Sequence, residues 1–423
     1  MLNIMKFIFR WSWRLVLAAV LFFNLRLYNT PPLPSSDHTI APSLMKQLKA
    51  NRKAIDNGAP TTMQQLFPEG AYFCYVLHGL TWVEAALREP DLAEQAIVEA
   101  KHALLKLESQ QCRSPFPPDL PPDHGMFYSA WKAHLQAGLV LLQEGQNAAD
   151  LQSLRDQCDS ISDSLSSVDS PFLASYRGCV WPCDTVPAIH ALKIYDHVTE
   201  EDRYQDLIAN WVSDVSDRFD PETGLISHTV NVHDGQPNSG ARATSQVIIL
   251  RMLPDIAPQL SQQQYELFRD RYLNTFVGMP CVREYPTGVY GEGDIDSGPL
   301  IFERCLSGTV FMIGLSQIYG DQDVANAIAT TGEVVGLPWT NGDEKRYVGG
   351  VLPVGDIMAT YSQNARCWLG GSAHHPADAH VVSKLWRWPV HLISMLFLIP
   401  TIVGLLRKRN RSEGPSTSTA LDQ

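Results

Sequence analysis

The sequence predicts an all-α protein built as an (α/α)6 toroid of six helical hairpins, with a transmembrane helix at each end. Apolar residues recur at helical spacing through most of the 423 residues. Gly, Pro and Asp residues that end helices divide this pattern into about twelve segments. A long apolar run lies near each end of the chain. Strand signals are scarce, and residues 224–232 form the one convincing extended segment.

The N-terminal apolar run covers residues 15–25, and several aromatic residues before it lengthen it toward the ~20 residues that a membrane span requires. Lys6, Arg10 and Arg14 give this end a basic character. A cleavable signal peptide is the competing interpretation. Arg26 and the lack of a small-residue cleavage site favour an uncleaved anchor.

The second apolar run extends over residues 388–406 and is followed directly by a basic segment, 407–411. Basic flanks face the cytoplasm in most membrane proteins, so both termini are expected there. The central domain is then extracytoplasmic, either periplasmic or lumenal. The predicted order is an anchor (1–28), a linker (29–42), the toroid (43–370), a linker (371–385), a second span (386–406) and a basic cytoplasmic tail (407–423).

The formal net charge of the chain is −12. Because both ends are basic, the central region is more acidic than the chain as a whole. Binding to nucleic acid depends on neutralising phosphates with Lys and Arg, so a nucleic-acid partner is excluded. The expected partners are a small-molecule or saccharide substrate and a membrane, and the sequence leaves oligomerisation open.

The eight cysteines permit disulfides, but their connectivity cannot be read from the sequence. No Cys-x-x-Cys or His-Glu-x-x-His spacing occurs, so neither a metal site nor a cofactor is predicted.

The helical pattern gives a set of expected helices between the two linkers. They cover residues 43–56, 69–88, 91–109, 125–144, 147–166, 184–198, 203–218, 240–253, 261–277, 297–319, 322–335 and 353–368. Six hairpins joined by long polar loops favour a toroid, in which inner helices surround a funnel; an unrelated helical bundle is the alternative. The segments expected at the funnel mouth are 111–124, 171–183, 220–240, 279–299 and 339–352.

The segment 281–299 is the most informative part of the chain, because it places four carboxylates in a glycine-rich loop ahead of an apolar helix. Loops of this kind often present binding and catalytic groups at the rim of a rigid scaffold. A simpler interpretation is that Asp296 or Ser297 caps the next helix. The four carboxylates are Glu284, Glu292, Asp294 and Asp296.

Two segments carry a family resemblance. The stretch 183–196, with the Asp-Pro-Glu-Thr-Gly turn at 220–224, resembles linalool dehydratase/isomerase. The second segment resembles the same family in the order of its parts: residues 282–284, then an acidic loop, then a helix that ends at Gly320. The resemblance covers roughly residues 68–365. It implies an (α/α)6 barrel with cofactor-free acid–base chemistry, which removes water from a tertiary alcohol and isomerises an allylic one.

The carry-over of functional residues from this family is partial. Cys183 matches an active-site cysteine of the family and Glu284 matches its glutamate. The catalytic histidine of the family falls on Trp131, and its other cysteine has no counterpart. The first functional hypothesis is therefore a lyase or isomerase acting on a small alcohol, with Cys183 and Glu284 sharing acid and base roles and Asp184 tuning the thiol.

The alternative is a glycoside-active enzyme, a hydrolase or lyase, which draws partly on analogy with other toroidal enzymes. Its carboxylate pair would come from Asp294, Asp296 and Glu284, because two carboxylates flank the bond that such enzymes cleave. His228 and His233, on the extended segment, are the preferred histidines for proton transfer. The aromatic residues expected to stack on a sugar are Trp131, Trp181, Tyr285, Tyr290 and Trp339.

A third hypothesis is a non-catalytic, membrane-tethered binding module. Loss of most positions that match a catalytic family is expected for such a relative, and equally for an enzyme with a new specificity. Glycine-rich acidic loops can also hold calcium, but the spacing Glu292-x-Asp294-x-Asp296 lacks the other positions of an EF-hand loop.

Overall fold

Six helices form a closed inner ring in which each helix contacts the next, and the last contacts the first. These helices are apolar on all sides, which is the pattern of a helix buried within a protein. The inner ring consists of α4 (Gly70–Arg88), α7 (Met126–Leu142), α9 (Pro182–Thr199), α11 (Ala243–Ile256), α13 (Leu306–Ile318) and α15 (Pro353–Gln363).

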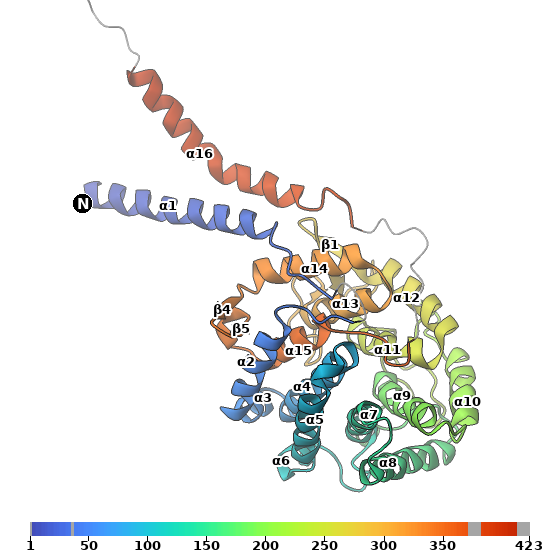
Figure 1. The fold of residues 1–423 in the computed structure, drawn as a ribbon. Helices are drawn as coiled ribbons and strands as arrows, with labels where there is room; N and C mark the ends of the chain where they lie inside the picture. Colours follow the sequence, from blue (N-terminus) through green and yellow to red (C-terminus); the bar gives the residue numbers. More distant parts are fainter. Residues whose placement is uncertain (1, 35–37, 371–381, 413–423) are drawn as a thin grey trace, which may run out of the picture.

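A second layer of helices covers the ring from outside (Figure 1). These helices are amphipathic; α8, for example, buries Leu154, Cys158 and Ile161 and exposes polar residues on its other face. The outer layer consists of α2 (Leu44–Asp56) with α3 (Ala59–Leu66), α5 (Ala93–Leu107), α8 (Ala148–Ser166), α10 (Gln205–Ser216), α12 (Pro258–Tyr272) and α14 (Gln322–Val335).

Alternation of inner and outer helices along the chain defines an (α/α)6 toroid, so this part of the predicted fold class is confirmed. The structure is a computed structural model that describes residues 2–34, 38–370 and 382–412. Within it, short α6 (Gln110–Arg113) and the 3-10 turns Pro90–Leu92 and Val348–Gly350 complete the helical elements of the toroid.

Most helices lie within a few residues of the predicted ranges, and α13 is the clearest exception. It begins at Leu306, whereas the sequence predicted a helix from residue 297. The intervening residues form a loop and the short strand β3 (Arg304–Cys305), which pairs with β2 (Met279–Arg283). Strand β1 (Leu273–Phe276) pairs antiparallel with β2. It replaces the last residues of the helix that was predicted over 261–277.

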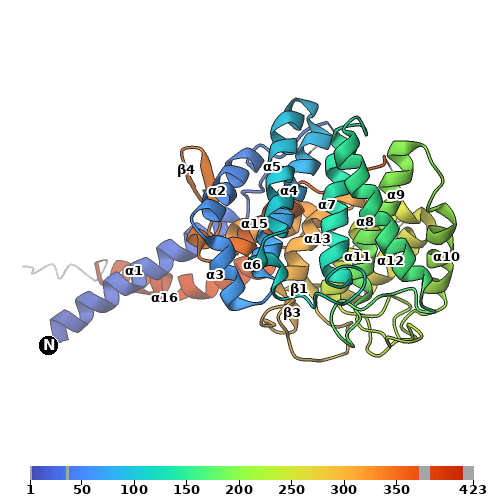
Figure 2. The same cartoon turned by 90° about the horizontal axis from the view of Figure 1, so that it is seen from below.

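The long loops that precede α7, α9, α11 and α13 gather on one face of the ring, at the bottom of Figure 2. We refer to this face as the mouth. Four of the five predicted mouth segments lie there, and 339–352 does not. That segment forms the hairpin of β4 (Trp339–Asn341) and β5 (Glu344–Arg346), which packs on α2 through ion pairs such as Lys53–Glu344 (2.6 Å).

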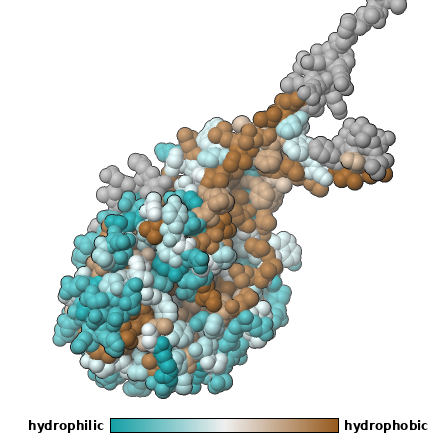
Figure 3. Space-filling model, turned by 180° about the vertical axis from the view of Figure 1, so that it is seen from behind, coloured by the Kyte–Doolittle hydropathy of each residue, from teal (hydrophilic) through white to brown (hydrophobic). Residues whose placement is uncertain are grey.

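Helices form at both ends of the chain, α1 (Leu2–Arg26) and α16 (Trp388–Ser412), and they pack against each other beside the toroid (Figure 1). Polar side chains pair between them: Asn24 Nδ2 donates to Ser394 Oγ at 2.7 Å, and Trp13 Nε1 donates to Thr401 Oγ1 at 2.7 Å. Figure 3 shows apolar surface along the described parts of both helices.

Over the described residues, neither terminal helix nor any other combines the length and the apolar character that crossing a membrane requires. The predictions of two transmembrane helices and of a membrane location with cytoplasmic termini are therefore wrong, and the expected membrane partner is not supported. Lys6, Arg10 and Arg14 recur through the first half of α1, and His391, Ser394 and Thr401 interrupt α16. The boundaries of the linkers stay predictions, and 371–381 and 413–423 lie outside the described residues.

Candidate active site

The mouth brings together side chains from three parts of the chain. Helix α9 starts with Pro182, whose fixed backbone suits the first turn of a helix, and this turn presents Cys183 and Asp184. Helix α11 starts after Arg242, and strand β2 delivers Glu284 directly at its end. Backbone hydrogen bonds fix this meeting, since the Ala243 N–H donates to the Glu284 carbonyl at 3.0 Å.

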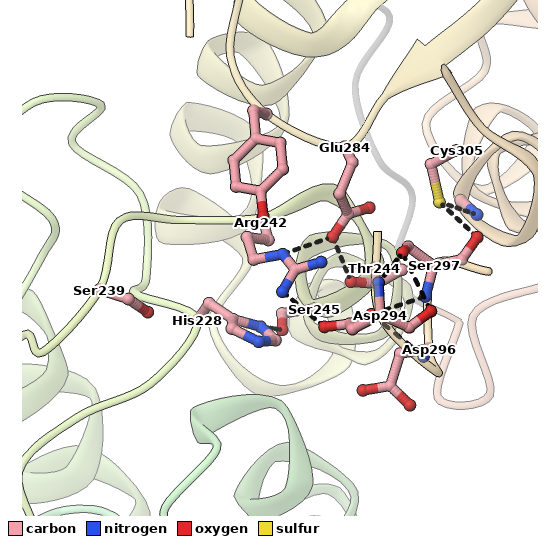
Figure 4. A network of polar contacts seen from close by, with 12 residues as sticks. His228, Ser239, Arg242, Thr244, Ser245, Glu284, Asp294, Asp296, Ser297 and Cys305 are labelled. Atoms are coloured by element: carbon pink, nitrogen blue, oxygen red, sulfur yellow. Dashed lines mark hydrogen bonds and ion pairs between the residues drawn. The ribbon is translucent and has the colours of Figure 1, made fainter. Parts of the chain in front are cut away.

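An arginine organises the carboxylates of the acidic loop (Figure 4). Arg242 Nε donates to Glu284 Oε1 at 2.7 Å, and its Nη1 donates to Asp294 Oδ2 at 2.5 Å. Thr244 Oγ1 donates to the same Glu284 oxygen at 2.8 Å. Glu284 is fully buried; burial raises its pKa, while Arg242 and Thr244 act in the opposite direction. Its carboxylate is thus held by two donors within the wall of the mouth.

Asp294 builds a tight turn with its other oxygen. Asp294 Oδ1 accepts the backbone N–H of Asp296 at 3.1 Å and of Ser297 at 3.0 Å, and Ser297 Oγ accepts the Asp294 N–H at 2.8 Å. Burial alone would raise the pKa of Asp294. The Ser297 N–H and the charge of Arg242 outweigh burial, so the pKa of Asp294 is lowered. The turn leaves the Asp296 carboxyl pointing away from the network, as Figure 4 shows.

Asp296 and Asp184 are the two carboxyls of the mouth whose pKa values are raised to about 7. Protein surrounds Asp296 although its side chain still reaches solvent; burial and the negative charges of Asp294 and Glu69 raise its pKa to about 7. Asp184 is 5% exposed and accepts a hydrogen bond from Ser175 Oγ at 2.5 Å. Burial raises the pKa of Asp184 to about 7, the Ser175 hydrogen bond opposes this, and the charge of Asp296 adds to it.

A fifth acid at the mouth, Glu69, was not predicted from the sequence. It lies immediately before α4, its carboxylate accepts a hydrogen bond from Tyr176, and its charge reaches both Asp184 and Asp296. Nothing in the sequence distinguished it, because an acid before an apolar helix is an ordinary helix start. Arg242 was missed because its partners lie 42 and 52 residues away in the sequence, and Ser175 because a serine in a loop carries no signal of its own.

Cys183 lies at the mouth but has no contact with Glu284 among the interactions of the described residues. Its Sγ lies 3.8 Å from Asp184 Oδ1. Burial, and then the neighbouring charge of Asp184, raise the pKa of Cys183 well above the usual value for a thiol. The side chain is thus a neutral thiol, which is a weak nucleophile and a weak base.

His228 also lies at the mouth, where its Nδ1 and Ser245 Oγ are hydrogen-bonded at 2.7 Å. Burial, together with the nearby Arg242 charge, lowers the pKa of His228 to about 4. The imidazole is therefore neutral at neutral pH and can act as a hydrogen-bond donor or acceptor, but not as a charged acid.

The five predicted stacking aromatics have different environments, and Trp339 lies away from the mouth, in strand β4, where it is exposed. Trp181 is half-buried at the start of α9, with its ring 6.0 Å from that of Tyr176 in an edge-on arrangement. The Tyr285 ring lies beside the Arg242 guanidinium at 5.1 Å. Trp131, by contrast, is 2% exposed and belongs to the core, and Tyr290 is 75% exposed on the outside of the loop.

A separate groove of about 640 Å³ lies on the outer surface and is lined by residues of α2 and α5 with Trp82 and Asp343. Its carboxylates pair with basic residues, as in Arg52–Glu99 at 2.8 Å, so it offers no acid–base pair. We therefore assign the candidate active site to the mouth. Over the described residues, no three His, Cys, Asp or Glu side chains are grouped so that they could hold a metal ion.

Comparisons with known proteins add a similarity to solved structures. No protein-family model matches the chain, and no curated protein sequence matches it. Among solved structures, the chain is similar to a GH76 alpha-mannanase from Bacteroides thetaiotaomicron, at 12% identity and a TM-score of 0.44, over 76% of this chain and 95% of that one. The assignment of a toroid rests on the contacts between the helices of this chain. The comparisons do not support the specific resemblance to linalool dehydratase/isomerase.

Proposed function

We propose that this chain is an enzyme that cleaves glycosidic bonds, with Asp184 and Asp296 as its acid–base pair. The observation that carries the proposal is the placement of two carboxyls, each with a pKa raised to about 7, at the mouth. The charge of Asp296 contributes to the raised pKa of Asp184, and at neutral pH one carboxyl can be protonated while the other is ionised. Glycosidic cleavage needs that combination.

The surroundings of the two carboxyls suggest their roles. Asp296 reaches solvent, and no hydrogen bond from the described residues involves its carboxyl oxygens. It can donate its proton to the glycosidic oxygen as that bond breaks. Asp184 is buried and oriented by Ser175, so its carboxylate can take a proton from the attacking water as the oxygen of that water bonds to the anomeric carbon.

The charge of the mouth limits the substrate class. Arg242 pairs with Glu284 and Asp294, whereas Glu69, Asp184 and Asp296 form no ion pair with a described basic residue. An anionic sugar such as a uronate would be repelled. Neutral saccharides and amino sugars fit the site better, and half-buried Trp181 offers a face for stacking.

One observation favours a lyase or isomerase acting on a small alcohol as the second candidate. The side chains of Phe73 and Phe127, in the first turns of α4 and α7, are half-buried and contact each other with ring centroids 5.3 Å apart. Such an apolar aromatic wall suits a hydrocarbon substrate. Two observations count against this candidate. Arg242 and Thr244 already donate hydrogen bonds to the Glu284 carboxylate, and Cys183 is a neutral thiol.

The test is a cleavage assay on neutral glucans and mannans, chitosan oligomers and polygalacturonate, with products separated by chromatography. Asp184→Asn and Asp296→Asn are each expected to lower kcat by about 100- to 10,000-fold, the usual contribution of a general acid or base. Asp206→Asn, on the exposed face of α10, is the matched control and should retain wild-type activity.

Cys183→Ala separates the two candidates, because a glycosidase should tolerate it and a dehydratase should not. Binding of an oligosaccharide without cleavage would instead support a non-catalytic binding module. Full activity in both Asp→Asn variants would refute the proposed acid–base pair.

A further inference from the structure

A single arginine side chain connects α11 to the loop that carries Asp296. Arg242 is the residue before α11, and the two nitrogens that it uses point to carboxylates ten residues apart in the sequence, Glu284 and Asp294. Glu284 marks the end of β2, and Asp294 starts the turn that presents Asp296. The side chain of Arg242 is 11% exposed; its pair with the buried Glu284 is shielded from solvent, whereas the Asp294 side chain is 39% exposed.

We propose that Arg242 is a positioning residue that clamps the 284–297 loop and thereby fixes the place and the charge environment of Asp296. The catalytic part of this inference rests on the proposed function, while the clamp itself can be tested without any substrate. No substrate or reacting atom needs to touch Arg242 for it to act in this way.

The mechanical argument follows from how the two oxygens of Asp294 are used. One oxygen accepts the N–H groups of Asp296 and Ser297, and the other accepts Arg242 Nη1. The carboxylate thus joins the turn to α11. A lysine could not replace the arginine, because only a planar guanidinium presents two fixed N–H directions to two carboxylates at once.

Other hydrogen bonds also hold the loop. The Glu284 N–H donates to the Glu303 carbonyl at 3.2 Å, and Ser307 Oγ donates to the Asp296 carbonyl at 2.7 Å. Between these two ends, the Thr287 N–H donates to the Arg271 carbonyl at 2.9 Å, and the Val289 carbonyl accepts Arg283 Nη2 at 2.8 Å. The Arg242–Asp294 pair adds the ion pair that joins the turn to the start of α11.

The electrostatic argument concerns all the charged groups that face Asp296. The positive charge of Arg242 lowers the pKa of Asp296, whereas nearby negative charges raise it. Removing Arg242 should therefore raise that pKa, and removing the charge of Asp294 should lower it. The titratable groups that interact with Asp296 are Glu69, Tyr176, Cys183, Asp184, Arg242, Glu284 and Asp294.

The experiment uses the full chain and four proteins: wild type, Arg242→Gln, Arg242→Lys and Asp294→Asn. Carbon-13 NMR of labelled aspartate follows the titration of Asp296, and hydrogen exchange follows the amides of 284–297. We expect the Asp296 titration to move to higher pH in Arg242→Gln and to lower pH in Asp294→Asn. The Asp296 and Ser297 amides should exchange about 10-fold faster or more in Arg242→Gln and in Arg242→Lys.

Arg271→Gln is the matched control. The carbonyl of Arg271 accepts a hydrogen bond from the same loop, through the Thr287 N–H at 2.9 Å, but its guanidinium donates to the Glu222 carbonyl outside the network. This variant should leave both measurements at their wild-type values. A residue with only a structural role would change exchange without the opposite shifts in titration.

Unchanged exchange and titration in Arg242→Gln would overturn the clamp. If Arg242→Gln fails to fold, Asp294→Asn keeps the clamp testable, because it removes the same ion pair while Asn can still accept the two N–H groups. Where glycosidase activity is present, Arg242→Gln should lower kcat/KM about 100-fold, the cost of a misplaced catalytic group. Absence of such activity in wild type, with the clamp measurements as expected, would count against the proposed function only.

Discussion

At the scale of single residues, Asp184 is held in an environment that its ionised form does not favour. The side chain is 5% exposed, lies near two other acids and receives a single strong hydrogen bond, from Ser175. Acids that serve in proton transfer are commonly kept in such places, where stability is given up for reactivity. The cost should be measurable as a dependence of stability on pH.

Asp184→Asn is expected to stabilise the protein at alkaline pH. The pKa of Asp184 rises from 3.8 to about 7 on folding, so its protonated form stabilises the fold fully below about pH 4, and this stabilisation is lost as pH rises through 7. The shift corresponds to on the order of 4 kcal/mol. Denaturant unfolding at pH 4 and pH 8 should show no gain at pH 4 and a gain of up to about that size at pH 8.

Asp255→Asn serves as the contrasting control for that experiment. Asp255 is buried, which opposes ionisation, yet His190 and the backbone N–H groups of Trp368 and Leu369 lower its pKa. Its ionised form therefore stabilises the fold, and the Asn variant should be less stable at pH 8. If both variants change stability in the same direction at pH 8, the assignment of Asp184 as a disfavoured anion is incorrect.

The residues of the site were only partly predictable from the sequence. Glu284, Asp294 and Asp296 were found because a glycine-rich acidic loop is a local signal. Arg242 and Glu69 were missed, because their roles depend on contacts with segments far away in the chain. Trp131 was assigned to a binding site, yet it packs in the core, since an aromatic residue on an inner helix is needed to fill the ring.

At the scale of helices, close packing within the inner ring depends on small residues. Gly314 in α13 faces the end of α15, and a Cβ there would lie 2.5 Å from the Ser362 carbonyl oxygen and 2.7 Å from the Ala365 Cβ. Gly332, in the outer helix α14, has open space around the same position. Close packing therefore requires glycine at position 314, whereas position 332 has room for a side chain.

Gly314→Ala is expected to destabilise the protein by about 1–3 kcal/mol, the usual effect of overpacking a core. Gly332→Ala, its matched control, should be neutral or stabilising by about 0.5–1 kcal/mol, because alanine favours a helix more than glycine does. Thermal unfolding of the two variants beside wild type measures both effects. Equal stability of the two variants would show that α13 and α15 can move apart without cost.

Helix positions were the most predictable feature of the fold, because their apolar periodicity is a local property. The predicted start of α13 was wrong, because it depends on a contact between residues that are distant in the sequence. Val282 pairs with Cys305 across a long loop, so Arg304 and Cys305 join a small sheet and residues 297–303 form a loop instead of extending the helix. Cys305 then takes the capping position expected for Asp296 or Ser297, with its Sγ accepting the Gly308 N–H at 3.2 Å.

At the scale of the whole molecule, buried ion pairs hold together helices that are not neighbours in the sequence. Arg251 of α11 and Glu84 of α4 form a pair at 2.6 Å, and both are nearly inaccessible to solvent. Trp368 Nε1 donates to the second oxygen of Glu84 at 3.2 Å. This pair connects opposite sides of the ring, so its loss should affect the toroid as a unit.

Glu84→Gln is expected to lower the free energy of unfolding by about 3–5 kcal/mol, because it leaves Arg251 as a buried charge without its partner. Glu94→Gln, on the exposed face of α5, is the control and should change stability by less than about 0.5 kcal/mol. Circular dichroism and tryptophan fluorescence should report one shared transition. A second transition confined to one probe would show that the ring unfolds in parts.

The common direction of the six inner helices has an electrostatic consequence. Their peptide dipoles are aligned, so partial positive charge gathers where they start, at the mouth, and partial negative charge where they end. The acids Glu69, Asp184 and Glu284 lie at the positive ends. At the opposite end, Arg88 donates to the carbonyls of Asn364 and Ala365, just beyond the end of α15. The backbone of the ring thus determines which face can hold a cluster of acids, whatever loops are built upon it.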